Sequence, residues 1–168
     1  MSQLSLPIES SLLVRDVAGE YRPASADEVL QAAQRLLGAQ LRGREVLTSP
    51  QAVRDFLRVK LGALEHEVFA VLMLDAQNRL IEYVELFRGT VSQASVYPRE
   101  VVKESLAFNA AAAIFCHNHP SGVAEPSRAD EMLTSTLKTA LSLVDVRVLD
   151  HLIVAGNDVM SFAERGLL

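Results

Sequence analysis

The stretch Ala111-Ala-Ala-Ile-Phe-Cys-His-Asn-His-Pro-Ser-Gly122 begins as an apolar run and ends in two histidines at a turn. A short apolar run bounded by turn residues is typical of a buried strand. Histidines at positions i and i+2, just past the end of such a strand, can point to the same side in extended backbone. We therefore expect a buried strand that delivers His117 and His119 to one edge of a sheet.

Helical and strand patterns alternate around this stretch. Apolar stripes predict helices that open at Ser25, at Ser49-Pro50, at Pro98 and at Ser127. The first should end at Gly38, the second at Gly62 and the third near Asn109. Further strands are predicted at 67–74, 80–87, 91–97, 111–116, 146–154 and 159–162. Strands interleaved with helices, several linked as hairpins, predict an α/β fold with a mixed β-sheet flanked by helices. Residues 1–24 read as an irregular or loosely strand-like leader.

Composition fits a single soluble domain. The chain has 168 residues, of which 49% are apolar and 22% charged. No apolar run approaches the roughly 20 residues that a membrane-spanning helix needs. Residues 1–7 lack the basic and apolar pattern of a secretory signal, and the single cysteine, Cys116, excludes an intramolecular disulfide. These features favour a cytoplasmic protein that does not bind membranes.

The charge balance argues against nucleic acid as a partner. The net charge is −5 and the sequence pI is about 5.4, whereas domains that grip phosphates usually carry a basic excess or stripe. The basic residues nearest to a cluster are Arg42, Arg44, Arg54, Arg58 and Lys60. A few cations near a helix are more often a solvated face than a DNA footprint.

Three residues form a candidate metal site. His117 and His119 precede Ser127-x-x-Asp130, which opens the next helix. Ser-x-x-Asp alone is more often a capping box, and a lone His-x-His is a weak signal. Together, two imidazoles and one carboxylate leave a fourth tetrahedral position for water, the pattern of a catalytic zinc site. We therefore predict one zinc ion per chain, held by His117, His119 and Asp130.

These motifs also resemble a known family. His-x-His-Pro, seven intervening residues and Ser-x-x-Asp are similar to the JAMM motif of MPN-domain metalloproteases. The fuller pattern resembles the bacterial RadC family through Arg88-Gly-Thr90, Pro98-Arg-Glu-Val101, His117-Asn-His-Pro-Ser-Gly122 and Leu149-Asp-His151. The resemblance runs from about residue 45, and it implies an MPN/JAMM, cytidine-deaminase-like architecture over 45–168. Residues 1–44 would be a leader and helix packed on or appended to it, lacking the glycine signature of the helix-hairpin-helix region that RadC proteins typically carry.

The resemblance implies a general base. JAMM enzymes use a glutamate at the start of a buried strand, and Glu67 matches that position. An acid that leads a wholly apolar strand must lie at the strand's end, where a cleft could lie. Glu65 is a competitor, whereas Glu82 and Glu85 alternate with apolar residues on a half-exposed strand and are weaker candidates.

Three further residues adjoin the motif. The family pattern implies that the Ser127 hydroxyl stabilises a developing oxyanion. His151 lies in an apolar strand, where a histidine is more often a satisfied core residue than a ligand, although it could also support a ligand. Cys116 should point opposite to His117 and serve as buried packing.

The leading functional hypothesis is a zinc-dependent hydrolase of peptide or isopeptide bonds that uses a metal-activated water, with Glu67 and Ser127 as catalytic residues. One alternative is a DNA-repair-associated protein acting on or near DNA. Another is a non-catalytic MPN scaffold. A peptide or protein is the expected substrate, and the loops at 88–98 and 120–127 would set its identity.

Overall fold

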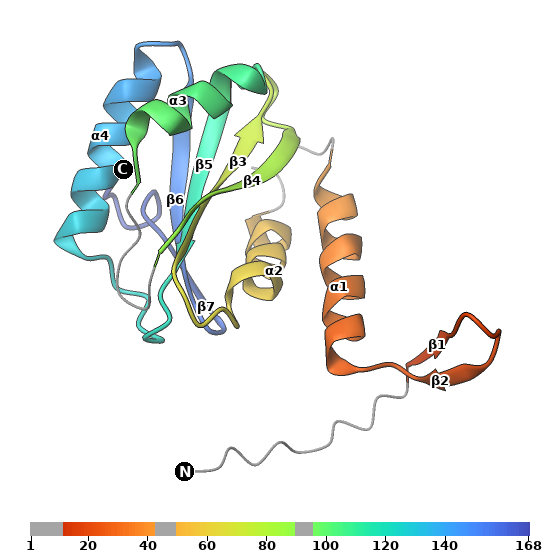
Figure 1. The fold of residues 1–168 in the computed structure, drawn as a ribbon. Coiled ribbons are helices and arrows are strands. Elements are labelled where there is room, and N and C mark those ends of the chain that lie inside the picture. Colours follow the sequence, from red (N-terminus) through yellow and green to blue (C-terminus); the bar gives the residue numbers. More distant parts are fainter. Residues whose placement is uncertain (1–11, 43–49, 90–95) are drawn as a thin grey trace.

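The computed structural model describes residues 12–42, 50–89 and 96–168. Its main feature is a five-stranded sheet of order β4-β3-β5-β6-β7, with a small β1-β2 hairpin near the N-terminus (Figure 1). The elements are β1 (Leu13–Arg15), β2 (Tyr21–Pro23), α1 (Ala26–Leu41), α2 (Pro50–Leu61), β3 (Val68–Leu74), β4 (Leu80–Arg88), α3 (Pro98–Ala107), β5 (Ala112–Asn118), α4 (Arg128–Ser142), β6 (Arg147–Ala155) and β7 (Asp158–Ser161).

The sheet is mixed. β5 and β6 pair in parallel, while the β4–β3, β3–β5 and β6–β7 pairs are antiparallel. A parallel neighbour needs a crossover connection, which here contains α4. This topology brings the start of β3 together with the ends of β4, β5 and β6 at one edge of the sheet. We call this edge the ligand edge, because β5 ends there in the candidate metal motif.

Helices cover both faces of the sheet (Figure 1). On one face, α2 packs Phe56, Leu57 and Leu61 against strand residues that include Leu72 and Cys116. On the other face, α3 and α4 pack Val101, Leu137 and Leu141 against strand residues that include Phe69, Val71, Met73 and Phe115. The two clusters use alternate residues of β3 and β5, as a strand covered on both faces requires.

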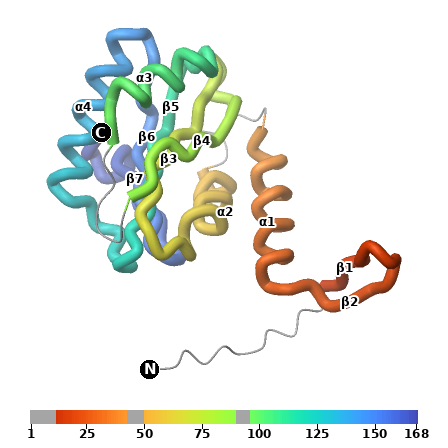
Figure 2. Tube along the Cα trace, viewed as in Figure 1, coloured from red at the N-terminus to blue at the C-terminus, as the bar shows by residue number. Residues whose placement is uncertain are grey.

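The helix α1 packs beside α2, and the β1-β2 hairpin lies at the N-terminal end of α1 (Figure 2). Gln34 donates its side-chain N–H to the carbonyl of Val59 at 3.2 Å. Arg42 forms an isolated bridge with Leu80 and an ion pair with Glu82 at 2.9 Å. These contacts tie α1 to α2 and to the outer strand β4.

The predicted α/β class, with a mixed sheet flanked by helices, is confirmed. The expected end of the first helix at Gly38 is wrong, because α1 continues to Leu41 and the Arg42 N–H still bonds to the Gly38 carbonyl at 3.2 Å. A Cβ at Gly38 would lie 3.4 Å from the Phe56 ring, so this position of α1 faces α2. The third helix also ends slightly early, at Ala107.

Parts of four predictions lie outside the described residues. These are residues 1–11 of the leader, the helix cap at Ser49, residues 90–95 of the loop at 88–98, and residues 91–95 of the strand expected at 91–97. The last two residues of that range, Val96 and Tyr97, are not in a strand, because Tyr97 is the N-cap of α3. In the leader, the described part contains the β1-β2 hairpin. Across the described ranges, no helix combines the length and apolar character needed to cross a bilayer.

Candidate metal centre

Three side chains converge at the ligand edge. The Nε2 atoms of His117 and His119 lie 2.9 Å apart. The Asp130 carboxylate approaches both rings, with Oδ1 at 3.3 Å from His117 Nε2 and Oδ2 at 3.6 Å from His119 Nε2. Among the described residues, this is the one group of three His, Cys, Asp or Glu side chains whose possible ligand atoms all lie within 4.8 Å of one another. The structure thus brings together the three residues expected to bind zinc.

Local backbone structure explains the positions of the two histidines. His117 lies near the end of β5, where it pairs with Phe69 of β3. His119 follows the strand, and its N–H still bonds to the Val154 carbonyl at 2.8 Å. Gly122 adopts a φ of 78°, which favours glycine, and its N–H closes a turn onto the His119 carbonyl at 3.1 Å. The chain therefore reverses toward α4 immediately after presenting both rings.

Hydrogen bonding orients the His119 ring. Its Nδ1 lies 2.7 Å from the Val123 carbonyl oxygen. A carbonyl can only accept, so Nδ1 carries the hydrogen and Nε2 faces the cluster. The Asp130 carboxylate, together with this carbonyl, raises the pKa of His119 above its usual range, against the opposing effect of burial.

Asp130 remains ionised in this setting. Burial alone would raise its pKa, but the His117 and His119 rings and the Ser127 hydroxyl outweigh burial and hold the pKa well below the usual range. Its position in the first turn of α4 also favours negative charge, because the N-terminal end of a helix is electropositive. A carboxylate that stays charged and lies beside two imidazoles is suited to bind a cation.

Ser127 caps α4 through a full capping box. Its Oγ accepts from the Asp130 N–H at 3.2 Å, and the Asp130 Oδ2 accepts from the Ser127 N–H at 2.7 Å. The Ser127 hydroxyl also donates to the same Oδ2 at 2.7 Å. The geometry is therefore compatible with Ser-x-x-Asp both as a helix cap and as part of a metal site. Asp130 completes the cap and also belongs to the candidate ligand set.

Glu67 lies at the ligand edge, directly before β3. Its carbonyl accepts from the Gly89 N–H at 2.8 Å, and its side chain is half-buried. Phe69 of β3 pairs with His117 of β5 in antiparallel register. Glu67, two residues before Phe69, and His119, two residues after His117, therefore lie at the same edge of the sheet. After Asp130, burial and the Val123 carbonyl, the charge of Glu67 makes the last contribution to the raised pKa of His119.

The other glutamates have different surroundings. Glu82 pairs with Arg42 and Glu85 with Lys60, at 2.9 and 3.8 Å, on the side of β4 that faces α1 and α2. Glu65 is exposed in the bend before β3. These positions favour Glu67 over its competitors, although its role as general base stays a prediction.

Two supporting residues escaped the sequence analysis. The Asn118 side chain holds the segment before β3, with Oδ1 accepting from the Val68 N–H at 2.8 Å and Nδ2 donating to the His66 carbonyl at 3.0 Å. Thr134 lies one helical turn after Asp130, and its Oγ1 is 2.6 Å from His151 Nδ1. The sequence held one signal for each residue. Asn118 is a polar residue between the two histidines, and Thr134 follows Asp130 at i,i+4, the spacing of neighbours on a helix surface.

His151 is both a core residue and a direct neighbour of His117. Its ring is fully buried and stacks on Phe162, with centroids 4.8 Å apart. Its Nε2 lies 2.8 Å from His117 Nδ1. A register shift after Ala113 places His151 opposite Phe115, on the α4 side of the sheet. Burial, aided by the nearby His117 ring, lowers the pKa of His151 well below its usual range.

Cys116 lies on the opposite face, as its alternation with His117 predicts. Its thiol is buried against the α2 side of the sheet, and Sγ contacts the Ala70 carbonyl at 3.4 Å. It is not part of the ligand group. Burial raises the pKa of this thiol, with a smaller contribution from Glu85.

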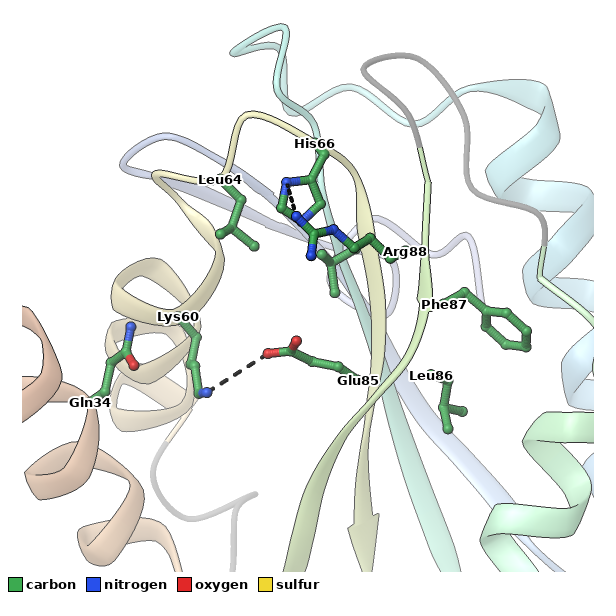
Figure 3. Close-up of a pocket in the computed structure, with 9 residues that line it drawn as sticks. Gln34, Lys60, Leu64, His66, Glu85, Leu86, Phe87 and Arg88 are labelled. Carbon is green, nitrogen blue, oxygen red and sulfur yellow. Dashed lines mark hydrogen bonds and ion pairs between the residues drawn. The ribbon is translucent and has the colours of Figure 1, made fainter.

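A cavity of about 520 Å³ borders the segment that precedes β3 (Figure 3). His66 and Arg88 contribute to its lining, with Arg88 Nη2 at 3.5 Å from His66 Nδ1. Lys60 and Glu85 face each other across it, as the dashed line in Figure 3 marks. Val68 belongs to the core cluster on the α2 side of the sheet, so the cavity opens on that side, and neither Glu67 nor a candidate metal ligand lines it.

The mixed sheet, the helices on both faces and the His-x-His and Asp cluster at the strand ends together define a domain of the JAB/MPN class. The family model described as "RadC-like JAB domain" matches residues 47–167. The chain belongs to this RadC-like family, as the sequence motifs indicated. The division of the chain near residue 45 into leader and domain stays a prediction.

Curated relatives carry the name UPF0758 protein. One from Leptothrix cholodnii is 65% identical over 150 residues, covering 89% of this chain and 68% of that protein. One from Methylibium petroleiphilum is 60% identical over 167 residues, covering 95% of this chain and 75% of that protein. One from Nitrosomonas eutropha is 58% identical over 150 residues. These names describe no activity, so the functional argument rests on the geometry of the candidate metal centre.

Proposed function

We propose that this protein is a zinc-dependent hydrolase of peptide or isopeptide bonds, with His117, His119 and Asp130 as the metal ligands. One observation carries the proposal: two imidazole nitrogens and one ionised carboxylate converge at the ligand edge. Catalytic zinc sites use three such protein ligands and leave one position for water or substrate. The proposed substrate is a peptide or protein.

The donor set fits zinc chemically. The His119 Nδ1 is engaged by the Val123 carbonyl, and the His117 Nδ1 by His151, so the Nε2 atoms of both rings face the cluster. Such contacts on the far nitrogen are typical of metal-binding histidines. Zinc held by these three side chains would lower the pKa of a bound water toward about 7 and polarise a carbonyl.

The surrounding residues would supply the remaining chemistry. Glu67, at the start of β3, would accept a proton from the attacking water and pass it to the leaving amine. Ser127 would donate its hydroxyl hydrogen to the developing oxyanion. That hydrogen now points to Asp130 Oδ2, so the hydroxyl must rotate for this role.

The two alternatives have less support. A non-catalytic scaffold does not require a converged ligand set with oriented rings. DNA binding requires free cations, whereas Arg42, Arg54 and Arg58 are paired with Glu82, Glu164 and Asp55. The net charge of −5 also opposes phosphate binding. A salt titration of binding to single- and double-stranded DNA checks this alternative, since phosphate contacts predict a steep salt dependence.

The decisive experiment assays the zinc-loaded chain against peptide and isopeptide libraries. We expect hydrolysis by the wild type, and retention of zinc with a loss of about 100-fold or more in turnover for Glu67→Gln. Glu65→Gln is the matched control and should hydrolyse normally. Equal hydrolysis by Glu67→Gln and wild type would move the base elsewhere. A zinc-loaded wild type that cleaves neither library would overturn the assigned activity.

A further inference from the structure

We infer that His151 and Thr134 form a buried relay that fixes His117 in the tautomer able to bind a metal ion through Nε2. They are positioning residues, because they contact a candidate ligand without facing the substrate side. The inference rests on the part of the proposed function that makes His117 a ligand. It does not depend on which bond the protein hydrolyses, or on whether it is a hydrolase.

The relay is a continuous series of short contacts. His117 Nδ1 lies 2.8 Å from His151 Nε2, and His151 Nδ1 lies 2.6 Å from Thr134 Oγ1. Thr134 Oγ1 in turn donates to the backbone carbonyl of Asp130 at 2.6 Å. All three side chains are buried, with exposed fractions of 2% for His117, 0% for His151 and 2% for Thr134.

Elementary hydrogen-bond chemistry gives the relay one direction. The Asp130 carbonyl can only accept, so the single Thr134 hydroxyl hydrogen must point to it. The Thr134 oxygen must then accept from His151 Nδ1–H. A neutral imidazole carries one N–H, and full burial favours the neutral ring, so His151 Nε2 is an acceptor.

The same reasoning extends to the candidate ligand. Because His151 Nε2 accepts, His117 Nδ1 must donate, and its hydrogen cannot also be on Nε2. The lone pair of His117 Nε2 is therefore directed at the cluster with His119 and Asp130. Which ring nitrogen is free to bind a metal is generally set by the hydrogen bond that the other nitrogen makes. Here that hydrogen bond belongs to a series whose other end lies on α4, at Asp130, the residue that supplies the third candidate ligand.

The relay therefore links two ligands of the same site. Its last acceptor is the backbone of Asp130, whose side chain is the candidate ligand on α4. Its first donor is the ring of His117 on β5. The hydroxyl of Thr134, one helical turn after Asp130, thus determines which nitrogen of the His117 ring on β5 carries the hydrogen. A β-branched residue without a hydroxyl would occupy the same space and leave this order undefined.

The test uses Thr134→Val, which keeps the shape and removes the hydroxyl, and Thr134→Ser, which restores it. The first readout is the tautomer of each histidine in the metal-free, ¹⁵N-histidine-labelled chain, from long-range ¹H–¹⁵N NMR correlations. The second is zinc affinity by competition with a chelator. We expect His117 and His151 to be Nδ1–H tautomers in wild type and Thr134→Ser. In Thr134→Val we expect mixed tautomers and zinc affinity lowered about 10- to 100-fold.

Ser105→Ala is the control for the loss of a buried hydroxyl. Ser105 is fully buried and bonds to the Val101 carbonyl at 2.8 Å, outside the relay. Its substitution should leave both readouts unchanged. An Nε2–H tautomer of His117 in the metal-free wild type overturns the inference even if Thr134→Val does not fold. So does a folded Thr134→Val variant with wild-type zinc affinity. A failure to find hydrolysis affects neither readout, so the two proposals fail separately.

Discussion

The side-chain oxygen of Asn118 accepts a hydrogen bond from the backbone N–H of Val68 at 2.8 Å. The same side chain donates to the His66 carbonyl at 3.0 Å. Asn118 lies between the two candidate histidine ligands, while Val68 follows the candidate base Glu67. One buried amide therefore joins the strand end that carries the ligands to the strand start that carries the base.

Asn118→Ala should reduce both stability and turnover while zinc is retained. It leaves the Val68 N–H and the His66 carbonyl without their buried partner, at a cost of about 1–3 kcal/mol in the free energy of unfolding. Urea unfolding of the metal-free chain measures the stability change. Asn157→Ala, at an exposed turn, should change stability by less than about 0.5 kcal/mol. Unaltered turnover in a destabilised Asn118→Ala variant would limit Asn118 to a structural role.

Asp130→Ala should abolish stoichiometric zinc binding, because it removes the one anionic member of the candidate ligand set. Metal analysis after dialysis against excess zinc measures the remaining equivalents. Glu131→Ala is the neighbouring control, with an exposed carboxylate in the same first helical turn. A full equivalent of zinc in folded Asp130→Ala would refute the ligand assignment.

Ser127→Ala and its counterpart Ser25→Ala separate capping from catalysis. Both serines head capping boxes, with Glu28 completing the one on α1 and Asp130 the one on α4. Each substitution should cost about 1 kcal/mol of stability. Only Ser127→Ala should also lower turnover, through loss of oxyanion stabilisation. The two variants are compared by thermal unfolding and by the peptide assay, and similar activity in both would leave Ser127 as a cap.

Cys116 should resist thiol reagents in the folded chain. Burial raises its pKa above the usual value and also keeps reagents away from the sulfur. A raised pKa means that the thiol stays protonated as the pH increases, so labelling should remain slow from about pH 7 to 9. In denaturant the same thiol should react fully. Rapid labelling of the native chain would show that the α2 face of the sheet opens readily.

Local signals explain what the sequence analysis predicted well. The caps at Ser25 and Ser127 and the apolar runs of β3 and β5 are each contained in a few neighbouring residues. The three candidate ligands could be grouped for the same reason, since His117, His119 and Asp130 lie within one strand–turn–helix unit, and their role as metal ligands stays a prediction. Even the position of Glu67 followed from one charged residue ahead of seven buried ones.

Interactions between distant residues explain what was missed. Asn118 and Val68 are 50 positions apart, and Thr134 and His151 are 17 apart. A single sequence contains no signal that pairs such residues. The predicted end of α1 was wrong for a related reason. Local propensity marks Gly38 as a helix terminator, whereas in the structure this position faces the Phe56 ring of α2.

The capping box of α4 gives the candidate metal centre a reporter in the backbone. Any local opening of the first helical turn would displace Asp130 and thereby release a ligand. A cation that binds only the closed form suppresses that opening in proportion to its occupancy. Amide hydrogen exchange at the start of α4 should therefore slow as zinc is added, while exchange at the similar start of α1, which holds no ligand, stays constant. Helix fraying would then measure site occupancy without any knowledge of the substrate.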